Sequence, residues 1–147
     1  EETLKNFDLG YKWNEIGNHY LKNHSLAPNT PPQTLFTERN IKVIKPGGIL
    51  ATVIPESLVS NKNYKHVVQY LLTKCQILGI IGMPESLFKT SGKGGTHTKT
   101  CLLVARKKKE SKMNGHSKSY TLFLAEARWC GHDSRANHIP KNDLPSK

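Results

Sequence analysis

Three short apolar runs constrain the fold of this 147-residue chain more than any other feature. They are ILATVIP at residues 49–55, ILGIIGM at 77–83 and TCLLVAR at 100–106. Each run carries apolar residues on both faces, which is typical of a strand buried on both sides of a parallel sheet. No run approaches the roughly 20 residues that cross a bilayer. We therefore predict buried strands at these places and no membrane association.

Two helical patterns alternate with the strands. The first follows Thr30, a candidate cap, with prolines suited to the first turn, and Pro46-Gly47-Gly48 ends it. Its apolar residues lie on one broad face: Leu35, Phe36, Val43 and Ile44. The second pattern places apolar residues at helical spacing from Tyr64 to Cys75, and it is the clearest amphipathic helix of the chain.

The connections predict how the strands pair. Strands joined through a helix pair in parallel by right-handed crossovers, whereas the helix-free connections 83–100 and 106–120 favour antiparallel pairing with a fourth strand at 120–127. We predict an α/β fold, a sheet of parallel strands with an antiparallel edge hairpin. Its predicted parts are a helix at 1–13, a polar loop at 14–30, a core at 31–127 and a loose tail at 128–147.

The charge balance indicates a polyanionic partner. The chain has 22 Lys and Arg against 11 Asp and Glu, a net charge of +11, and nucleic acid is the commonest partner of such an excess. An anionic membrane is the rival, but no basic amphipathic helix is present. The acidic start is unlike a signal peptide. Three cysteines without a CxxC motif suit a reducing compartment, so we expect a cytoplasmic protein.

The segment KTSGKGGTHTKT, residues 89–100, has the composition of a phosphate-binding loop. A P-loop, however, follows a strand and opens a helix, and here Lys99-Thr100 opens a strand. The pattern G-x-x-x-x-G-K-[ST] also fails, because Gly92-Lys93 is followed by Gly94. We therefore interpret the segment as a basic loop whose lysines could contact the phosphates of a polynucleotide.

Other polar residues are weaker candidates. Glu56 and Glu85 each follow a predicted strand in a PES sequence, where a ligand crevice of an open α/β sheet would lie, although the sequence favours turn and capping roles for both. Cys130, His132 and His138 could ligate a metal, but their spacing matches no standard zinc site. We predict no metal centre.

Several blocks, taken in order, resemble one family. They are LFTERNIKVIKPGGILATVIPESLVSN, starting at Leu35, then YLLTKCQILGIIGMPESLFKTSGKGGTHTKTCLLVARK, YTLFLAEA and GHDSRANHIPKNDLP. Over residues 31–145 the chain resembles adenine-N6 DNA methyltransferases, above all the modification subunits of type I restriction systems and their fused relatives. The resemblance implies a Rossmann-like sheet that uses S-adenosylmethionine and methylates the exocyclic amine of adenine after flipping the base out of the duplex.

The chain departs from this family at its catalytic motif. It contains no Asn-Pro-Pro followed by an aromatic residue, and no glycine-rich cofactor turn. In the family, text like FDLGYKW comes shortly after the catalytic motif, so the chain is expected to be the C-terminal half of a catalytic domain. It is then expected to be inactive alone, with S-adenosylmethionine held mainly by the preceding half and no catalytic residue of its own.

The resemblance also implies where DNA would bind. Phe88 matches the aromatic residue that stacks on the flipped base, although it could instead pack the turn, and both readings stay open. Lys89, Lys93 and Lys99 are then placed to contact DNA phosphates, whereas the run 106–109 is expected to be solvated surface. The implied partners are double-stranded DNA and a specificity subunit or target-recognition domain. The alternative is a basic nucleic-acid-binding module without chemistry.

Overall fold

The computed structural model describes residues 2–88, 98–109, 120–133, 135, 137 and 138. At its centre lies a four-stranded sheet in the order β3-β5-β4-β6. The strands are β3 (Ile49–Pro55), β4 (Cys75–Gly82), β5 (Thr100–Lys107) and β6 (Phe123–Glu126). The three apolar runs are thus confirmed as strands, and the predicted fourth strand is confirmed in a shorter form.

The pairing is mixed, as expected, but its arrangement differs from the prediction. β5 is antiparallel to both β3 and β4, so it lies inside the sheet rather than in an edge hairpin. β6 does not pair with β5 and instead lies parallel to β4. Burial explains the place of β5, because Cys101, Leu103 and Ala105 are buried and are covered best with a strand on each side.

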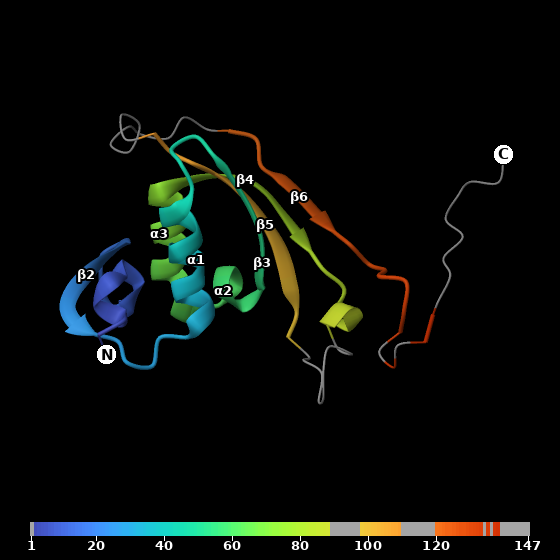
Figure 1. Cartoon of the computed structure of the whole chain (residues 1–147), viewed down its shortest axis with the longest axis horizontal. Helices are drawn as coiled ribbons and strands as arrows, with labels where there is room; N and C mark the ends of the chain where they lie inside the picture. The colour runs from blue at the N-terminus through green and yellow to red at the C-terminus, as the bar shows by residue number, and fades with distance from the viewer. Residues whose placement is uncertain (1, 89–97, 110–119, 134, 136, 139–147) are drawn as a thin grey trace.

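Two helices cover one face of the sheet. They are α1 (Pro32–Val43) and α3 (Lys65–Lys74), and Figure 1 shows both between the sheet and the N-terminal hairpin. The amphipathic pattern correctly predicted α3, which buries Val67, Tyr70 and Leu71. The connection before α3 forms the short helix α2 (Ser57–Ser60) and the 3-10 turn η3 (Lys62–Tyr64).

The buried face of α1 is not the one that the apolar pattern predicted. Phe36 and Val43 are 67% and 65% exposed. The helix instead buries Thr34, Thr37, Glu38 and Ile41. Thr30 is not its cap either, since the N-cap residue is Pro31 and the Thr30 hydroxyl donates to the carbonyl of Ala27 at 2.7 Å.

The N-terminal segment corrects the prediction of a helix followed by a polar loop. Two 3-10 turns, η1 (Leu4–Asn6) and η2 (Asp8–Gly10), lead into an antiparallel hairpin of β1 (Tyr11–Ile16) and β2 (His19–Leu26). Gly17 turns the chain with φ of +61°, a conformation that glycine adopts without strain. Aromatic and polar residues alternate along β1, a period of two that the weak helical spacing of the aromatic residues concealed.

The basic run 106–109 was expected to be solvated, but two of its lysines hydrogen-bond carbonyls at the C-terminal ends of helices. The Lys107 ammonium donates to the carbonyls of Ile44 at 2.7 Å and Lys42 at 3.2 Å, at the end of α1. The Lys108 ammonium donates to the Leu72 carbonyl at 2.6 Å, near the end of α3. Cations are favourable there because they meet the negative end of the helix dipole. Within the described ranges, no helix is long and apolar enough to cross a membrane.

Candidate functional site

The carboxyl ends of β3 and β4 meet at one edge of the sheet, where β5 begins. Backbone hydrogen bonds fix this edge: Glu56 N–H donates to the Lys99 carbonyl and Met83 N–H to the Thr100 carbonyl, both at 2.9 Å. β3 and β4 point the same way on either side of the antiparallel β5. In open α/β sheets, ligands bind outside the carboxyl ends of the strands. The described edge is therefore the candidate site that the fold itself indicates.

Charged residues of both signs line this edge. The Lys99 ammonium lies 3.2 Å from a Glu56 carboxylate oxygen and 3.9 Å from one of Glu126, and the Arg128 guanidinium lies 3.5 Å from Glu126. Beside them is an open cleft of about 500 Å³, lined by Met83, Pro84, Glu85, Ser86, Lys99, Glu126, Ala127 and Arg128. Because these ion pairs are solvent-exposed, each contributes only about 0–1 kcal/mol and can exchange for another partner.

The DNA-contacting residues expected from the resemblance are only partly described. Phe88 is half-buried and ends the turn η4 (Glu85–Phe88), which follows β4. Lys99 lies at the same edge, paired with carboxylates. Lys89 and Lys93 fall outside the described residues. The structure therefore places Phe88 and Lys99 on the two segments that meet at this edge, and a role in DNA binding stays a prediction.

The cysteine and histidines of the tail do not gather around a common point. The Cys130 thiol lies 3.2 Å from the Ser86 hydroxyl and donates to the His132 carbonyl at 3.4 Å. The backbones of His132 and His138 meet in an isolated bridge. In the part of the chain that the structure describes, no group of three or more His, Cys, Asp or Glu residues is arranged to hold a metal ion.

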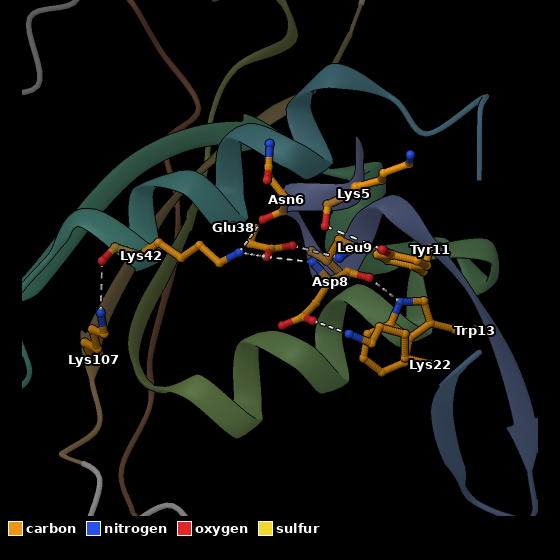
Figure 2. A network of polar contacts seen from close by, with 10 residues as sticks. All are labelled: Lys5, Asn6, Asp8, Leu9, Tyr11, Trp13, Lys22, Glu38, Lys42 and Lys107. Atoms are coloured by element: carbon orange, nitrogen blue, oxygen red, sulfur yellow. Dashed lines mark hydrogen bonds and ion pairs between the residues drawn. The ribbon is translucent and has the colours of Figure 1, made fainter. Parts of the chain in front are cut away.

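One buried carboxylate was missed by the sequence analysis. Glu38, on α1, is 0% exposed and accepts the backbone N–H groups of Asp8 at 2.8 Å and Leu9 at 2.7 Å. The Lys42 ammonium lies 2.7 Å from the same carboxylate and also donates to the Asn6 carbonyl. Figure 2 shows Glu38 directed at the turn that carries these amides. The carboxylate thus anchors the N-terminal segment to the helix layer.

The neighbouring charges complete this anchor. Burial raises the pKa of Asp8, but the hydrogen bond and charge of Lys22, at 2.5 Å, outweigh it and leave the pKa below its ordinary value. Trp13, on β1, donates its indole N–H to the Asp8 carbonyl at 3.2 Å. A sequence signal for Glu38 did exist, because Thr34, Thr37, Glu38 and Ile41 have helical spacing, but a mostly polar stripe does not resemble a core face.

With this geometry established, comparison with known proteins identifies the family. The family model for N-6 DNA methylase matches residues 4–144. The chain belongs to the N-6 DNA methylase family. The match contains nearly all of the resemblance over residues 31–145 and extends it through the N-terminal hairpin.

Individual relatives of this N-6 DNA methylase chain are larger proteins. It is 32% identical over 81 residues to Defense against restriction protein B of Escherichia phage P1, covering 55% of this chain and 4% of the phage protein. A crystal structure of a class I S-adenosylmethionine-dependent methyltransferase from Listeria monocytogenes matches with a TM-score of 0.54 and 22% identity, covering 85% of this chain and 31% of that one. The M protein of the type I restriction enzyme EcoKI matches with a TM-score of 0.47 and 22% identity, covering 67% and 20%.

These comparisons show the fold of the chain and how much of each relative's length it spans. The Listeria structure shows that the mixed sheet is that of a class I methyltransferase, which confirms the predicted fold class. The N-6 DNA methylase chain spans less than a third of the length of each of these relatives.

Proposed function

We propose that the chain is the C-terminal half of a catalytic domain that transfers a methyl group from S-adenosylmethionine to the N6 amine of adenine in DNA. The observation that carries the proposal is the N-6 DNA methylase match over residues 4–144, on a sheet with the fold of a class I methyltransferase. The net charge of +11 supports a polyanionic substrate. An amine inside a stacked duplex is inaccessible, so the target base must be flipped out.

An exposed apolar border supports the view that more of the domain packs against this chain. β3 is an edge strand of the described sheet, and its residues Ile49 and Val53 are exposed. Phe36 and Val43 are exposed on α1, which packs beside β3. Large apolar side chains that share one border favour burial by another part of the protein. We infer that the sheet continues beyond β3 in the complete domain.

The cofactor is then held mainly by that other part. The cleft at the carboxyl edge is lined largely by charged and polar side chains, and among the described residues it has no enclosed apolar slot for an adenine ring. The edge alone does not fit S-adenosylmethionine, and we propose that the isolated chain binds it weakly and does not methylate DNA. Micromolar binding of the cofactor to the isolated chain in a calorimeter would contradict this.

DNA would approach the same edge. Phe88 is proposed to stack on the flipped base, and Lys89, Lys93 and Lys99 are proposed to contact phosphates, with Lys99 exchanging its carboxylates for DNA. Double-stranded DNA and a specificity subunit or target-recognition domain are the proposed partners, and the cytoplasm is the proposed location.

The test is methyl transfer by the complete polypeptide that carries these residues. It is incubated with duplex DNA and S-adenosylmethionine that carries an isotopic label in its methyl group, and the label in the DNA is counted. We expect incorporation by the complete polypeptide and none by residues 1–147 alone. Binding of DNA without any transfer by the complete polypeptide would favour the alternative, a nucleic-acid-binding module without chemistry.

A further inference from the structure

A second cleft lies away from the sheet edge, between the N-terminal hairpin and the first turns of α1 and α3. Its volume is about 690 Å³. The hairpin forms one wall, and the other is formed by the segment 27–31 with Thr34 and by Lys62–Tyr64 with His66. The residues that line this cleft are separate from those that line the cleft at the carboxyl edge.

Aromatic rings form one side of this cleft. The ring centroids of Trp13 and His66 lie 6.1 Å apart with 31° between their planes, and those of Tyr20 and His66 lie 6.5 Å apart at 52°. Burial lowers the pKa of His66, more than its backbone hydrogen bond with Asn63 raises it, so the imidazole is neutral at pH 7. A neutral ring flanked by an indole and a phenol suits stacking with a planar heterocycle.

A hydroxyl group without a partner lies in the same wall. Thr34 is 1% exposed, and its Oγ1 has no hydrogen-bond partner within the described part of the chain. Thr37, one turn further along α1, is equally buried, but its hydroxyl donates to the Gln33 carbonyl at 2.8 Å. A buried hydroxyl that makes no bond is unfavourable, and Thr34 is one of the residues that line the cleft.

The rim of the cleft is basic. Lys12 and Lys62 are exposed among the lining residues, and neither forms an ion pair with another described residue. Glu15 is the one acidic residue among those that line the cleft. A basic residue, Lys62, at the rim of a stacking surface matches the two parts of a nucleotide, a planar base and a charged phosphate.

We propose that this cleft binds one unstacked nucleotide of the DNA substrate, with its base against Trp13, Tyr20 and His66 and its phosphate near Lys62. The Thr34 hydroxyl then hydrogen-bonds an edge of the base. This rests on the proposed function, because flipping a base out of the duplex leaves its former partner base unpaired. The chemistry is shared with a free mononucleotide, and the experiment separates the two sources.

The experiment uses the complete polypeptide and a single-stranded oligonucleotide containing one 2-aminopurine, whose fluorescence falls when the base stacks. We expect His66→Ala to weaken binding about 5- to 100-fold, the range of one lost stacking contact, and His66→Phe to restore it. Thr34→Val should weaken binding about 2- to 10-fold without lowering the unfolding midpoint, because the hydroxyl makes no bond in the fold. Thr37→Val is the matched control and should leave affinity unchanged.

A salt titration tests the phosphate contact. Lys62→Ala should lower the slope of log affinity against log salt by about 0.7, the value for one phosphate contact with a single strand. Lys65→Ala, which makes the same charge change outside the cleft, should leave the slope unchanged. AMP that binds as tightly as the oligonucleotide would contradict the assignment to DNA.

The two proposals fail separately. Methyl transfer to DNA together with unchanged oligonucleotide affinity in His66→Ala and Thr34→Val would overturn the cleft and leave the proposed function intact. Binding that depends on these residues, in a polypeptide that transfers no methyl group, would overturn the function and leave the cleft intact.

Discussion

Removal of the Glu38 carboxylate is the perturbation whose effect the structure defines best. The side chain is 0% exposed and holds two backbone N–H groups, those of Asp8 and Leu9, at 2.8 and 2.7 Å. Hydrogen bonds to a charged group contribute about 1.5–3 kcal/mol each. Glu38→Ala removes both and leaves a buried donor without a partner, so we expect a loss of about 3–5 kcal/mol. Because domains are stable by only about 5–15 kcal/mol, this would unfold a large part of the population.

Glu38→Gln separates the two bonds. The amide has one acceptor oxygen, so it can keep one of the N–H donors while its own NH₂ group faces the other. We expect a loss of about 1.5–3 kcal/mol, smaller than that of Glu38→Ala. Glu15→Gln, the same change at an exposed position of β1, is the control and should stay within about 0.5 kcal/mol of wild type.

The assay combines denaturant unfolding of the complete polypeptide with amide hydrogen exchange of the peptide that spans residues 4–16. If Glu38 anchors this segment, the Asp8 and Leu9 amides of Glu38→Gln should exchange faster than those of wild type under conditions in which the rest of the protein stays folded. If both Glu38 variants unfold at the wild-type midpoint and the amides of residues 4–16 exchange at the wild-type rate, Glu38 does not anchor this segment.

Further predictions concern Asp8, Lys107 and the proposed DNA-contacting residues. The folded-state pKa of Asp8 lies below its ordinary value of 3.8, so the contribution of Asp8 to stability is present above pH 3.8 and is lost as the pH falls through the folded-state pKa. Lys22→Ala should raise the pKa of Asp8 in an NMR titration. An unchanged pKa would contradict the pairing of Asp8 with Lys22. Lys107→Met should lower the free energy of unfolding by about 1 kcal/mol in a denaturant melt, because two carbonyls at the end of α1 lose their donor. In the complete enzyme, Phe88→Ala should lower steady-state methylation about 10- to 100-fold, and Lys93→Ala should weaken binding to all DNA sequences and lower the salt slope by about one unit. Wild-type turnover by Phe88→Ala would leave its ring as packing of the turn.

The elements that local pattern specifies were predictable from the sequence. The helix α3 has an unbroken apolar stripe, and β3, β4 and β5 are continuous apolar runs. The expected burial on both sides is wrong for β3, because its Ile49 and Val53 are exposed. Strand order was less accessible, because the sequence shows that a connection lacks a helix but not which gap the returning strand enters. β5 enters between β3 and β4, where both of its edges are paired and the face that carries Cys101, Leu103 and Ala105 is buried.

Long-range polar contacts were not predictable. Glu38 is buried because amides 29 and 30 residues earlier bind it, and no local pattern in α1 contains that information. The hairpin was hidden for a related reason: Tyr20 exchanges two hydrogen bonds with the Gln69 side chain on α3, and this contact lies 49 residues away in sequence. The candidate cleft depends on that docking, so its aromatic residues could be read from the sequence but not their meeting point.

The identity of the methylated base tests the proposed adenine methylation most directly. Duplex DNA is incubated with the complete polypeptide and S-adenosylmethionine and is then digested to nucleosides. The nucleosides are separated by chromatography and identified by mass spectrometry. We predict that N6-methyldeoxyadenosine forms in this reaction and is absent from reactions without enzyme. Methyldeoxycytidine products, or DNA that carries no methyl group although the polypeptide binds it, would contradict the assignment to adenine methylation.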